Sequence, residues 1–349
     1  MPRKKTKSVR VGSVKIGGGA PVVVQSMTCT DTRDVKSTVH QIKRLEDAGC
    51  EIVRVAVPDE EAADALTDIR RDIDIPLIAD IHFNHFLALK AIENSVDGIR
   101  VNPGNIGREK MKGIIEAAKE KNVAIRIGIN AGSLEKDILE KHGSPTVDAL
   151  LESTMRSIAF FEDMNFDNIK LSLKSSDVNT MVDAYRGISE MTDYPLHLGV
   201  TEAGSLVNAA IKSSIGLGIL LHEGIGDTVR VSVTGDPVDE ISVAYGILRA
   251  LGIRRVGPDI ISCPTCGRCE IDLFGLVREV EERLSGMKGY MKIAIMGCVV
   301  NGPGEAAEAD IGIAGGRRSG LLFKKGKAVR KIKEEEFVDA LIHEINTMM

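Results

Sequence analysis

The feature that most constrains the fold is a regular alternation of short apolar strands with amphipathic helical segments between Pro21 and about Ala250. Such alternation is typical of a parallel α/β sheet. Eight strand-then-helix units can be counted, with strands expected at residues 21–27, 51–57, 76–80, 98–101, 123–129, 168–173, 196–200 and 228–233. Eight units in roughly 240 residues match a closed (β/α)₈ TIM barrel, and an open doubly wound sheet is the alternative.

A break at Gly257 and Pro258 separates this region from a C-terminal segment with a different rhythm. We therefore predict a TIM barrel over residues 1–258 and a small α+β domain over residues 259–349. In the small domain we expect a cysteine loop, helices at 271–284 and at the C-terminus, strands at 292–296 and near 310–314, and a hairpin turning at 325–326. In the barrel, the long spacing between the fifth and sixth strands predicts an extra turn near residues 140–145.

Composition excludes several functional classes. The 349-residue chain is 43% hydrophobic and 27% charged, as expected for a globular protein. It has no Trp, 8 Phe and 4 Tyr, and its formal net charge is −5, so it offers neither a base-stacking platform nor a basic field for nucleic acid. It lacks a long apolar span and the apolar core of a signal peptide. We expect a cytoplasmic protein with no nucleic-acid or membrane partner.

Five of the expected strands carry a basic residue between two aliphatic residues, namely Arg54, Arg100, Arg126, Lys170 and Arg230. Because side chains alternate along a strand, the aliphatic neighbours would face the helices and the cations would face the barrel interior. Interior carboxylates are few: Asp80 is the best candidate, and Glu202 follows the seventh strand. Unpaired buried charges are costly, so the set implies a bound polyanion such as a phosphorylated small molecule. Any single cation could instead pair with an acid at the barrel base.

The cysteines suggest a metal centre. Cys263, Cys266 and Cys269 form a C-x-x-C-x-x-C run, and Cys298 follows later in the chain. Thiolates so spaced can converge on tetrahedral zinc or on an iron–sulfur cluster, and spacing alone would make Cys269 the fourth ligand. The other two cysteines, Cys29 and Cys50, stand alone and are expected to be reduced and buried.

Several long motifs resemble the IspG/GcpE family, the bacterial 4-hydroxy-3-methylbut-2-enyl diphosphate synthases. They occur in order as QSMT at 25–28, RVNPGN at 100–105, RIGINAGSL at 126–134, TEAG at 201–204, ISCPTCGR at 261–268 and GCVVNGPGE at 297–305. The resemblance implies reductive ring opening and dehydration of 2-C-methyl-D-erythritol 2,4-cyclodiphosphate to 4-hydroxy-3-methylbut-2-enyl diphosphate. This reaction belongs to the methylerythritol phosphate route to isoprenoids.

The resemblance also implies one [4Fe–4S] cluster per chain, held by Cys263, Cys266, Cys298 and Glu305. A carboxylate binds iron more weakly than a thiolate, so one iron can exchange it for a substrate oxygen. We therefore prefer Glu305 to Cys269 as the fourth ligand and expect Cys269 to lie nearby without binding iron.

For the barrel, the resemblance implies that basic residues bind the cyclic diphosphate and that two acids act in catalysis. The substrate-binding residues would be Arg54, Arg100, Arg126 and Lys174, and the catalytic acids would be Asp80 and Glu202. Glu202 is the candidate proton donor to the departing oxygen. The family further implies a homodimer in which the cluster domain of one subunit closes over the barrel of the other, with flavodoxin or ferredoxin as the electron donor.

Two other functions remain open on the residues alone. One is a metal-free barrel enzyme acting on a phosphorylated or pterin-like ligand, with a structural zinc domain attached. The other is a non-enzymatic iron–sulfur sensor whose barrel only binds a ligand. Iron, sulfide and zinc contents distinguish the zinc protein from the two cluster proteins.

Overall fold

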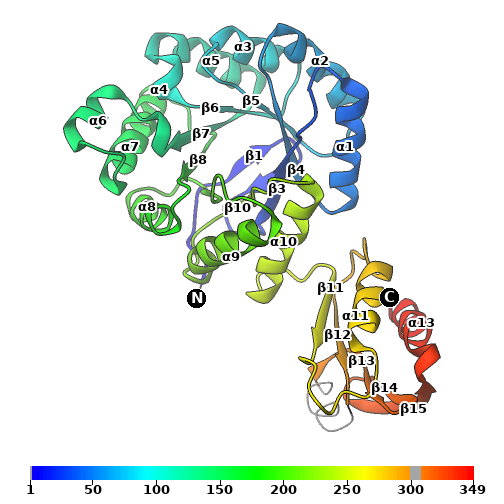
Figure 1. The fold of residues 1–349 in the computed structure, drawn as a ribbon. Helices are drawn as coiled ribbons and strands as arrows, with labels where there is room; N and C mark the ends of the chain where they lie inside the picture. The colour runs from blue at the N-terminus through cyan, green and yellow to red at the C-terminus, as the bar shows by residue number, and fades with distance from the viewer. Residues whose placement is uncertain (1, 299–307) are drawn as a thin grey trace. The chain divides into compact units, whose positions relative to one another are not determined.

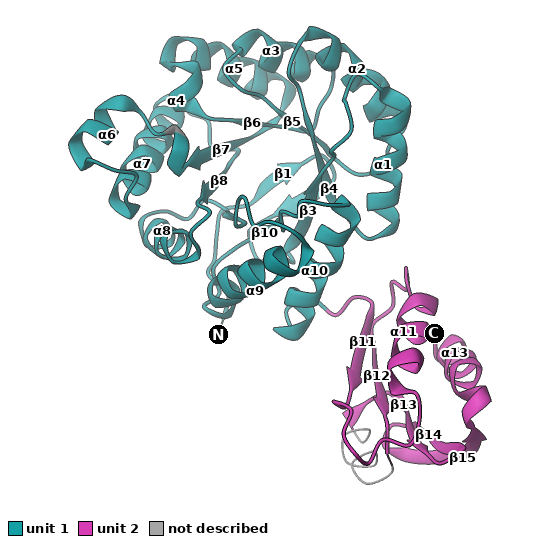
Figure 2. Ribbon diagram, viewed as in Figure 1, with its two compact units in different colours: residues 1–254 teal, residues 255–349 magenta. Residues whose placement is uncertain are grey.

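The computed structural model describes residues 2–298 and 308–349. The chain forms two compact units, Met1–Arg254 and Arg255–Met349, shown in teal and magenta in Figure 2. The first holds the β/α alternation and the second holds the cysteine loop. Along the described residues, no helix combines the length and apolar character needed to cross a membrane.

The first unit is a near-closed parallel barrel (Figure 1). Its eight strands are hydrogen-bonded in the order β8-β7-β6-β5-β4-β3-β10-β9, and a parallel bridge between Leu171 and Leu196 connects the two ends. The strands are β3 (Val23–Met27), β4 (Ile52–Ala56), β5 (Leu77–Asp80), β6 (Gly98–Val101), β7 (Ala124–Asn130), β8 (Ile169–Lys174), β9 (His197–Leu198) and β10 (Thr228–Val229). The predicted TIM barrel is confirmed.

Helices surround the barrel, and each long helix follows a strand, as Figure 1 shows. They are α1 (Val35–Asp47), α2 (Glu60–Arg71), α3 (His85–Glu93), α5 (Arg108–Lys121), α7 (Val147–Asp163), α8 (Val178–Met191), α9 (Leu206–His222) and α10 (Pro237–Ala250). Several begin at a polar residue whose side chain accepts a hydrogen bond from the first-turn backbone, as Asp59 does from Ala62 N. Such caps satisfy the free N–H groups of a helix start and mark where each strand-to-helix loop ends.

Two barrel features differ from the expected pattern. The spacing after β7 holds a short 3₁₀ turn (Ala131–Ser133) and a helix, α6 (Lys136–His142), rather than one extra turn near 140–145. A hairpin of β1 (Val9–Val11) and β2 (Val14–Ile16) precedes the barrel and was not expected. Its apolar residues pack with residues near the starts of the barrel strands, including Val23, Ile52 and Ala124. The hairpin therefore covers the N-terminal end of the barrel.

Over its described residues, the second unit is a five-stranded mixed sheet packed with helices α11 and α13, which gives the expected small domain of strands and helices. The sheet order is β11 (Pro258–Ser262), β12 (Met291–Met296), β13 (Ile311–Gly316), β14 (Ser319–Lys324) and β15 (Lys327–Lys333). Strands β11, β12 and β13 are parallel to one another, β14 is antiparallel to β13, and β15 is antiparallel to β14. Helices α11 (Leu273–Arg283) and α13 (Phe337–Met348) contribute Leu276, Val280 and Leu341 to its core. Strand β11 was not expected, because it directly follows the break at Gly257.

Candidate active site and metal centre

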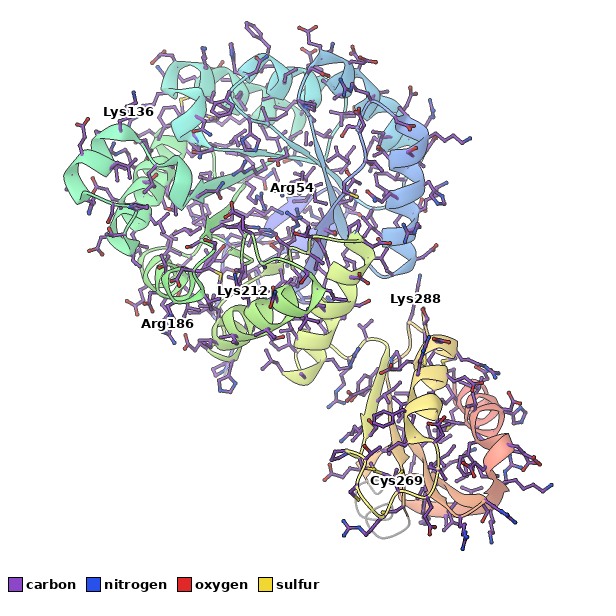
Figure 3. The ribbon with its side chains drawn as sticks, in the orientation of Figure 1. Arg54, Lys136, Arg186, Lys212, Cys269 and Lys288 are labelled. Atoms are coloured by element: carbon purple, nitrogen blue, oxygen red, sulfur yellow. The ribbon has the colours of Figure 1, made fainter. Side chains whose placement is uncertain are left out.

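A row of charged residues crosses the barrel interior. Asp80, Arg100, Arg126 and Lys170 are direct register partners on the adjacent strands β5, β6, β7 and β8. Register partners in a parallel sheet point to the same side, so the four side chains share one face. All four are buried, and Arg54 on β4 lies inside the same barrel, as labelled in Figure 3. The strand register thus gathers cations around one carboxylate.

Asp80 contacts several basic groups from different strands. Its carboxylate oxygens lie 3.4 Å from Arg100 Nη1, 3.8 Å from Arg54 Nε and 3.7 Å from His82 Nε2. Burial opposes ionisation of Asp80, but the Arg54 charge, the neighbouring His82 and the Arg100 and Arg126 charges together hold the pKa of this carboxyl well below its usual range. The ionised form of Asp80 is therefore favoured, and its carboxylate contacts the Arg54 and Arg100 guanidinium groups.

The remaining cations lack enough acceptors within the described residues. Arg126 Nε and Nη1 and Arg100 Nε are buried without a hydrogen-bond partner there. Lys170 Nζ reaches only a weak contact, 3.4 Å from Gln25 Oε1. Burial, followed by neighbouring cations, sets the pKa of Arg126 and of Lys170 well below their ordinary values. An unpartnered buried donor costs about 1–3 kcal/mol, so a ligand with several anionic oxygens fits this interior.

Lys174 stands at the C-terminal end of β8, and its buried ammonium group belongs to the same cluster. Burial, and then the charges of Arg126 and Arg230, lower the pKa of Lys174 well below its ordinary value. Gly199 leaves the space that Lys174 occupies, because a Cβ at position 199 would stand 3.1 Å from its Nζ. A bound anion would offset the repulsion between Lys174 and the neighbouring arginines and would favour the charged form of its amine.

Arg230 has its own counter-ion, which sequence reasoning missed. Its Nη2 lies 3.2 Å from Glu240 Oε1, and Glu240 also accepts a hydrogen bond from Ser26 Oγ at 2.7 Å. Glu240 is buried on the inward face of α10, at helical spacing from the buried Pro237 and Ala244. That spacing was a usable signal, because an acid on an apolar helix face needs a buried partner. Arg230 is thus paired, unlike Arg126.

Two rim residues adopt a backbone conformation that only glycine adopts easily. Glu202, just after β9, has φ +52°, and Phe83, just after β5, has φ +61°. Both follow the C-terminal ends of barrel strands, which is where barrel enzymes place their sites. Left-handed backbone at a non-glycine residue is strained and is concentrated at functional sites. The Glu202 side chain is exposed.

The cysteines gather at one edge of the second sheet. Cys263 follows β11, and Cys298 follows the adjacent parallel strand β12. Gly297 N donates a hydrogen bond to Cys263 Sγ at 3.3 Å, so the two strand ends lie together. Cys263 and Cys269 both pack against the core of the unit, and Cys266 is exposed. The Cys269 thiol also donates to Ile271 O at 3.3 Å. Over residues 2–298 and 308–349, no three His, Cys, Asp or Glu side chains converge to hold a metal, and Glu305 lies outside that part of the chain.

Residues 6–245 match the GcpE TIM-barrel domain, and residues 259–347 match the GcpE protein C-terminal domain. The chain belongs to the GcpE family. It is 58% identical over 349 residues to 4-hydroxy-3-methylbut-2-en-1-yl diphosphate synthase (flavodoxin) from Clostridium perfringens, covering 100% of both chains. It is 56% identical over 348 residues to the protein of the same name from Geobacter sulfurreducens, covering 99% of both chains.

The GcpE barrel also resembles other solved barrels at low identity. Dihydropteroate synthase from Yersinia pestis matches with a TM-score of 0.50 and 14% identity, over 71% of this chain and 99% of that chain. Type I 3-dehydroquinate dehydratase from Clostridium difficile matches with a TM-score of 0.52 and 17% identity, over 71% and 98%. At such identities the likeness concerns the fold alone.

One cysteine prediction for this GcpE chain is wrong. Cys50 is buried, and burial raises the pKa of its thiol to about 12. Cys29 is exposed instead of buried. It lies two residues beyond the end of β3, where the chain has left the barrel wall, and its sulfur accepts a hydrogen bond from Gln41 Nε2 at 3.1 Å.

Replacing Gly128 with alanine is expected to weaken anion binding by about 10- to 100-fold. A Cβ at this position would stand 2.5 Å from Arg100 Nε and 3.1 Å from its Nη2, so the guanidinium must shift from the position in which its Nη1 contacts Asp80. Titration with inorganic pyrophosphate measures the loss. Gly113→Ala is the matched control, because a Cβ on that α5 glycine meets nothing within 4 Å and should leave binding unchanged. Equal affinities for both variants would contradict the assigned role of Arg100.

Replacing His197 with asparagine is expected to flatten the fall in unfolding free energy between pH 7 and pH 5. His197 is fully buried, with Nδ1 2.7 Å from Thr228 Oγ1, and burial, then the charges of Arg126 and Lys174, put its pKa well below the ordinary value. The unfolded chain binds a proton on this histidine below about pH 6.5, and the folded chain does not, so stability is lost as pH falls, by up to about 1.4 kcal/mol per pH unit. Urea unfolding measures the slope, and the exposed His222→Asn should retain the wild-type slope.

Proposed function

We propose that this chain is an iron–sulfur oxidoreductase that converts 2-C-methyl-D-erythritol 2,4-cyclodiphosphate into 4-hydroxy-3-methylbut-2-enyl diphosphate. The product is the compound for which its relatives are named as synthases. The observation that carries the proposal is the registered row of Asp80, Arg100, Arg126 and Lys170, whose unpartnered donors suit a diphosphate. The reaction is a two-electron reduction with loss of water, and it belongs to the methylerythritol phosphate route to isoprenoids.

The cysteine loop suits one [4Fe–4S] cluster per chain. Cys263, Cys266 and Cys298, together with Glu305, would hold it. The fit rests on the donor chemistry and on the position of the cysteines after the neighbouring strands β11 and β12, tied by the Gly297 N to Cys263 Sγ contact. When bound, such a cluster supplies electrons and a Lewis-acidic iron with one exchangeable ligand. Cys269, whose thiol already donates to Ile271 O, stays outside the ligand set.

The barrel residues would bind and orient the substrate. Arg54, Arg100, Arg126 and Lys174 provide planar and point-like cationic donors for the two phosphate groups. Asp80 would keep Arg54 and Arg100 in place, since it contacts both guanidinium groups. Because the cations repel one another in the free barrel, part of the binding energy comes from relief of that repulsion. The buried interior also excludes water from the ion pairs, which strengthens them.

Replacing Glu202 with glutamine is expected to lower kcat by about 100-fold and to leave KM within a factor of three. Glu202 would donate the proton to the departing oxygen, and the amide preserves shape without an acidic proton. Steady-state kinetics with reduced flavodoxin would measure both constants. Glu223→Gln is a suitable control, because that surface acid pairs with Arg186 on the outside of the barrel. Unimpaired turnover of Glu202→Gln would remove this role.

The electron donor and the subunit arrangement complete the proposal. The relatives carry "flavodoxin" in their name, so flavodoxin is the first donor to test, with ferredoxin as the second. We further propose a homodimer, in which the cluster domain of one subunit serves the barrel of the other. This arrangement would bring to the cations a cluster that is held on a separate unit of the chain.

Anaerobic purification with iron, sulfide and zinc analysis tests the proposal first. About four irons and four sulfides per chain, a brown absorption band and reductant-dependent consumption of the cyclodiphosphate are expected. Stoichiometric zinc in a colourless protein would instead favour the phosphate-binding barrel with a structural zinc domain. A cluster without turnover under any reductant would favour the iron–sulfur sensor.

A further inference from the structure

The antiparallel hairpin of β14 and β15 carries charge of one sign only. From Ile311 to Lys333 the chain holds eight basic residues and no Asp or Glu, although acids outnumber bases in the chain as a whole. The eight lie on the two strands and in the turns on either side of β14. They are Arg317, Arg318, Lys324, Lys325, Lys327, Arg330, Lys331 and Lys333, and we call this set the basic hairpin.

Most of these cations are exposed and have no counter-ion. Lys324 pairs with Glu344 and Lys333 pairs with Glu335, and the other six form no ion pair with any residue that the structure describes. Strand β15 is the edge of its sheet (Figure 1), and Ile332 is its single buried residue. Charges on an edge strand prevent pairing between chains, but acids would serve that purpose equally well. The single sign therefore points to a partner of opposite charge.

The basic hairpin reaches the end of the sheet at which the cysteines lie. Arg317 stands in the turn between β13 and β14, and its backbone N–H donates a hydrogen bond to Glu270 Oε2 at 2.9 Å. Glu270 directly follows Cys269 in the chain. Lys333 is the register partner of Ser319, which follows the same turn. Exposed cations and cysteines thus share one edge of the second unit.

A second cation lies on the face of the sheet that borders the cysteines. Lys331, Leu321, Ala314 and Met296 are register partners across β15, β14, β13 and β12, so their side chains share one face. Cys263 packs against the apolar cluster on that face. Neighbouring strands are about 4.8 Å apart, which places Lys331 about 14 Å from β12. A standard interface of about 800 Å² per partner is about 30 Å across and could cover both.

The chemistry of the basic hairpin favours an acidic protein over a lipid surface or a nucleic acid. Its one exposed large hydrophobic residue is Val329, whereas membrane-bound segments insert several apolar side chains. Its one aromatic residue, Phe323, is buried, so no base can stack on it. A protein that carries electrons to the cysteine loop needs a docking surface beside that loop, and the basic hairpin provides one.

We propose that the basic hairpin docks the acidic carrier that supplies electrons to this enzyme. The inference deepens, and rests on, the flavodoxin-dependent reaction of the proposed function. Two reduced carriers that each give up one electron would supply the two electrons, while the substrate takes up two protons and one water is released. Complementary charge speeds encounter and fixes orientation, so its loss acts on the KM for the carrier and weakens with added salt.

Steady-state kinetics of the cluster-loaded enzyme with two reductants tests the surface. The double variant Arg318→Glu/Lys331→Glu should raise the KM for reduced flavodoxin by about 10-fold or more at low salt. Its kcat with excess dithionite, which needs no docking surface, should equal that of the wild type. Both residues are exposed, so iron content and the circular dichroism spectrum should not change. Lys331→Met, which removes one charge without reversing it, should raise the KM by a smaller factor.

Lys288→Glu is the matched control, because it makes the same charge change in the same unit. Lys288 is exposed and precedes β12, whereas the cysteine loop lies at the opposite end of the sheet, as the labels of Lys288 and Cys269 in Figure 3 show. The KM for flavodoxin should stay at the wild-type value. An unchanged KM in the double variant, or an equal loss of turnover with dithionite, would overturn the docking surface.

Calorimetric titration of the loaded enzyme with oxidised flavodoxin separates this inference from the proposed reaction. Salt-sensitive binding that the double variant loses, in a protein without turnover under any reductant, would overturn the reaction and leave the surface standing. Turnover with flavodoxin that is insensitive to both salt and the double variant would do the reverse. Binding of phosphatidylglycerol vesicles or duplex DNA that the double variant loses, with flavodoxin binding intact, would overturn the acidic-protein assignment.

Discussion

Replacing Arg126 with methionine is expected to lower kcat/KM by about 1,000-fold while it raises the free energy of unfolding by about 1–3 kcal/mol. Arg126 is fully buried, two of its nitrogens have no partner among the described residues, and burial together with Arg54 and Arg100 lowers its pKa. Methionine removes the repulsion and keeps most of the volume. A gain in stability with a loss of activity is the signature of a residue retained for its ligand.

Urea unfolding of the cluster-free protein and steady-state kinetics of the loaded enzyme measure the two effects. Arg186→Met is the matched control: Arg186 is half-exposed and pairs with Glu223, so its loss should change either quantity little. A destabilised Arg126→Met protein with wild-type kcat/KM would show that Arg126 is structural. Lys170→Met should reproduce the gain in stability, because Lys170 is also fully buried and its ammonium group has only a weak contact, at 3.4 Å, with Gln25 Oε1.

Replacing Cys266 with serine is expected to reduce bound iron to less than half of the wild-type content and turnover by more than 1,000-fold. If three thiolates hold the proposed cluster, the substitution removes one of its three iron–thiolate attachments. Cys266 is exposed, so the substitution should leave the fold of the cluster-free protein unchanged. Iron and sulfide analysis, with circular dichroism as the fold readout, measures the outcome.

Cys269→Ser provides the matched control within the same loop. We expect it to retain a full cluster, because the Cys269 thiol donates to Ile271 O. Glu305→Ala should retain less iron than Cys269→Ser. If Cys269→Ser loses the cluster and Glu305→Ala retains a four-thiolate one, Cys269 is the fourth ligand.

The barrel could be predicted because its signal is local and repeated. Each strand-then-helix unit has its own apolar run, and eight repeats of modest reliability support one another. The hairpin of β1 and β2 could not be found this way, because three-residue strands are too short to show a period. It forms because its apolar residues pack with residues near the starts of the barrel strands, a contact that exists only after the barrel is assembled.

For the charged residues inside the barrel, the direction of each side chain could be predicted from the sequence, but its partner could not. Alternation along a strand indicates which side Arg100 and Arg126 face, but partners come from register and from distant helices. Glu240 illustrates this: it is 10 residues from Arg230 in sequence and reaches it only because α10 packs on the barrel. The prediction that Cys29 is buried was wrong for a related reason. Burial of a single residue beyond the end of a strand depends on the path that the loop takes away from the barrel wall.

The hairpin that covers the N-terminal end of the barrel makes the interior a dead end. A ligand that enters toward Arg126 must leave through the same C-terminal opening of the barrel. A substrate analogue that does not react would therefore occupy the route by which the product has to leave. We expect its anionic end to enter first, because the unpartnered donors lie inside the barrel, and its other end to point back along that route. An inhibitor of this barrel therefore has room to grow in one direction only, and a diphosphate tethered to a bead through its far end should still reach the cations.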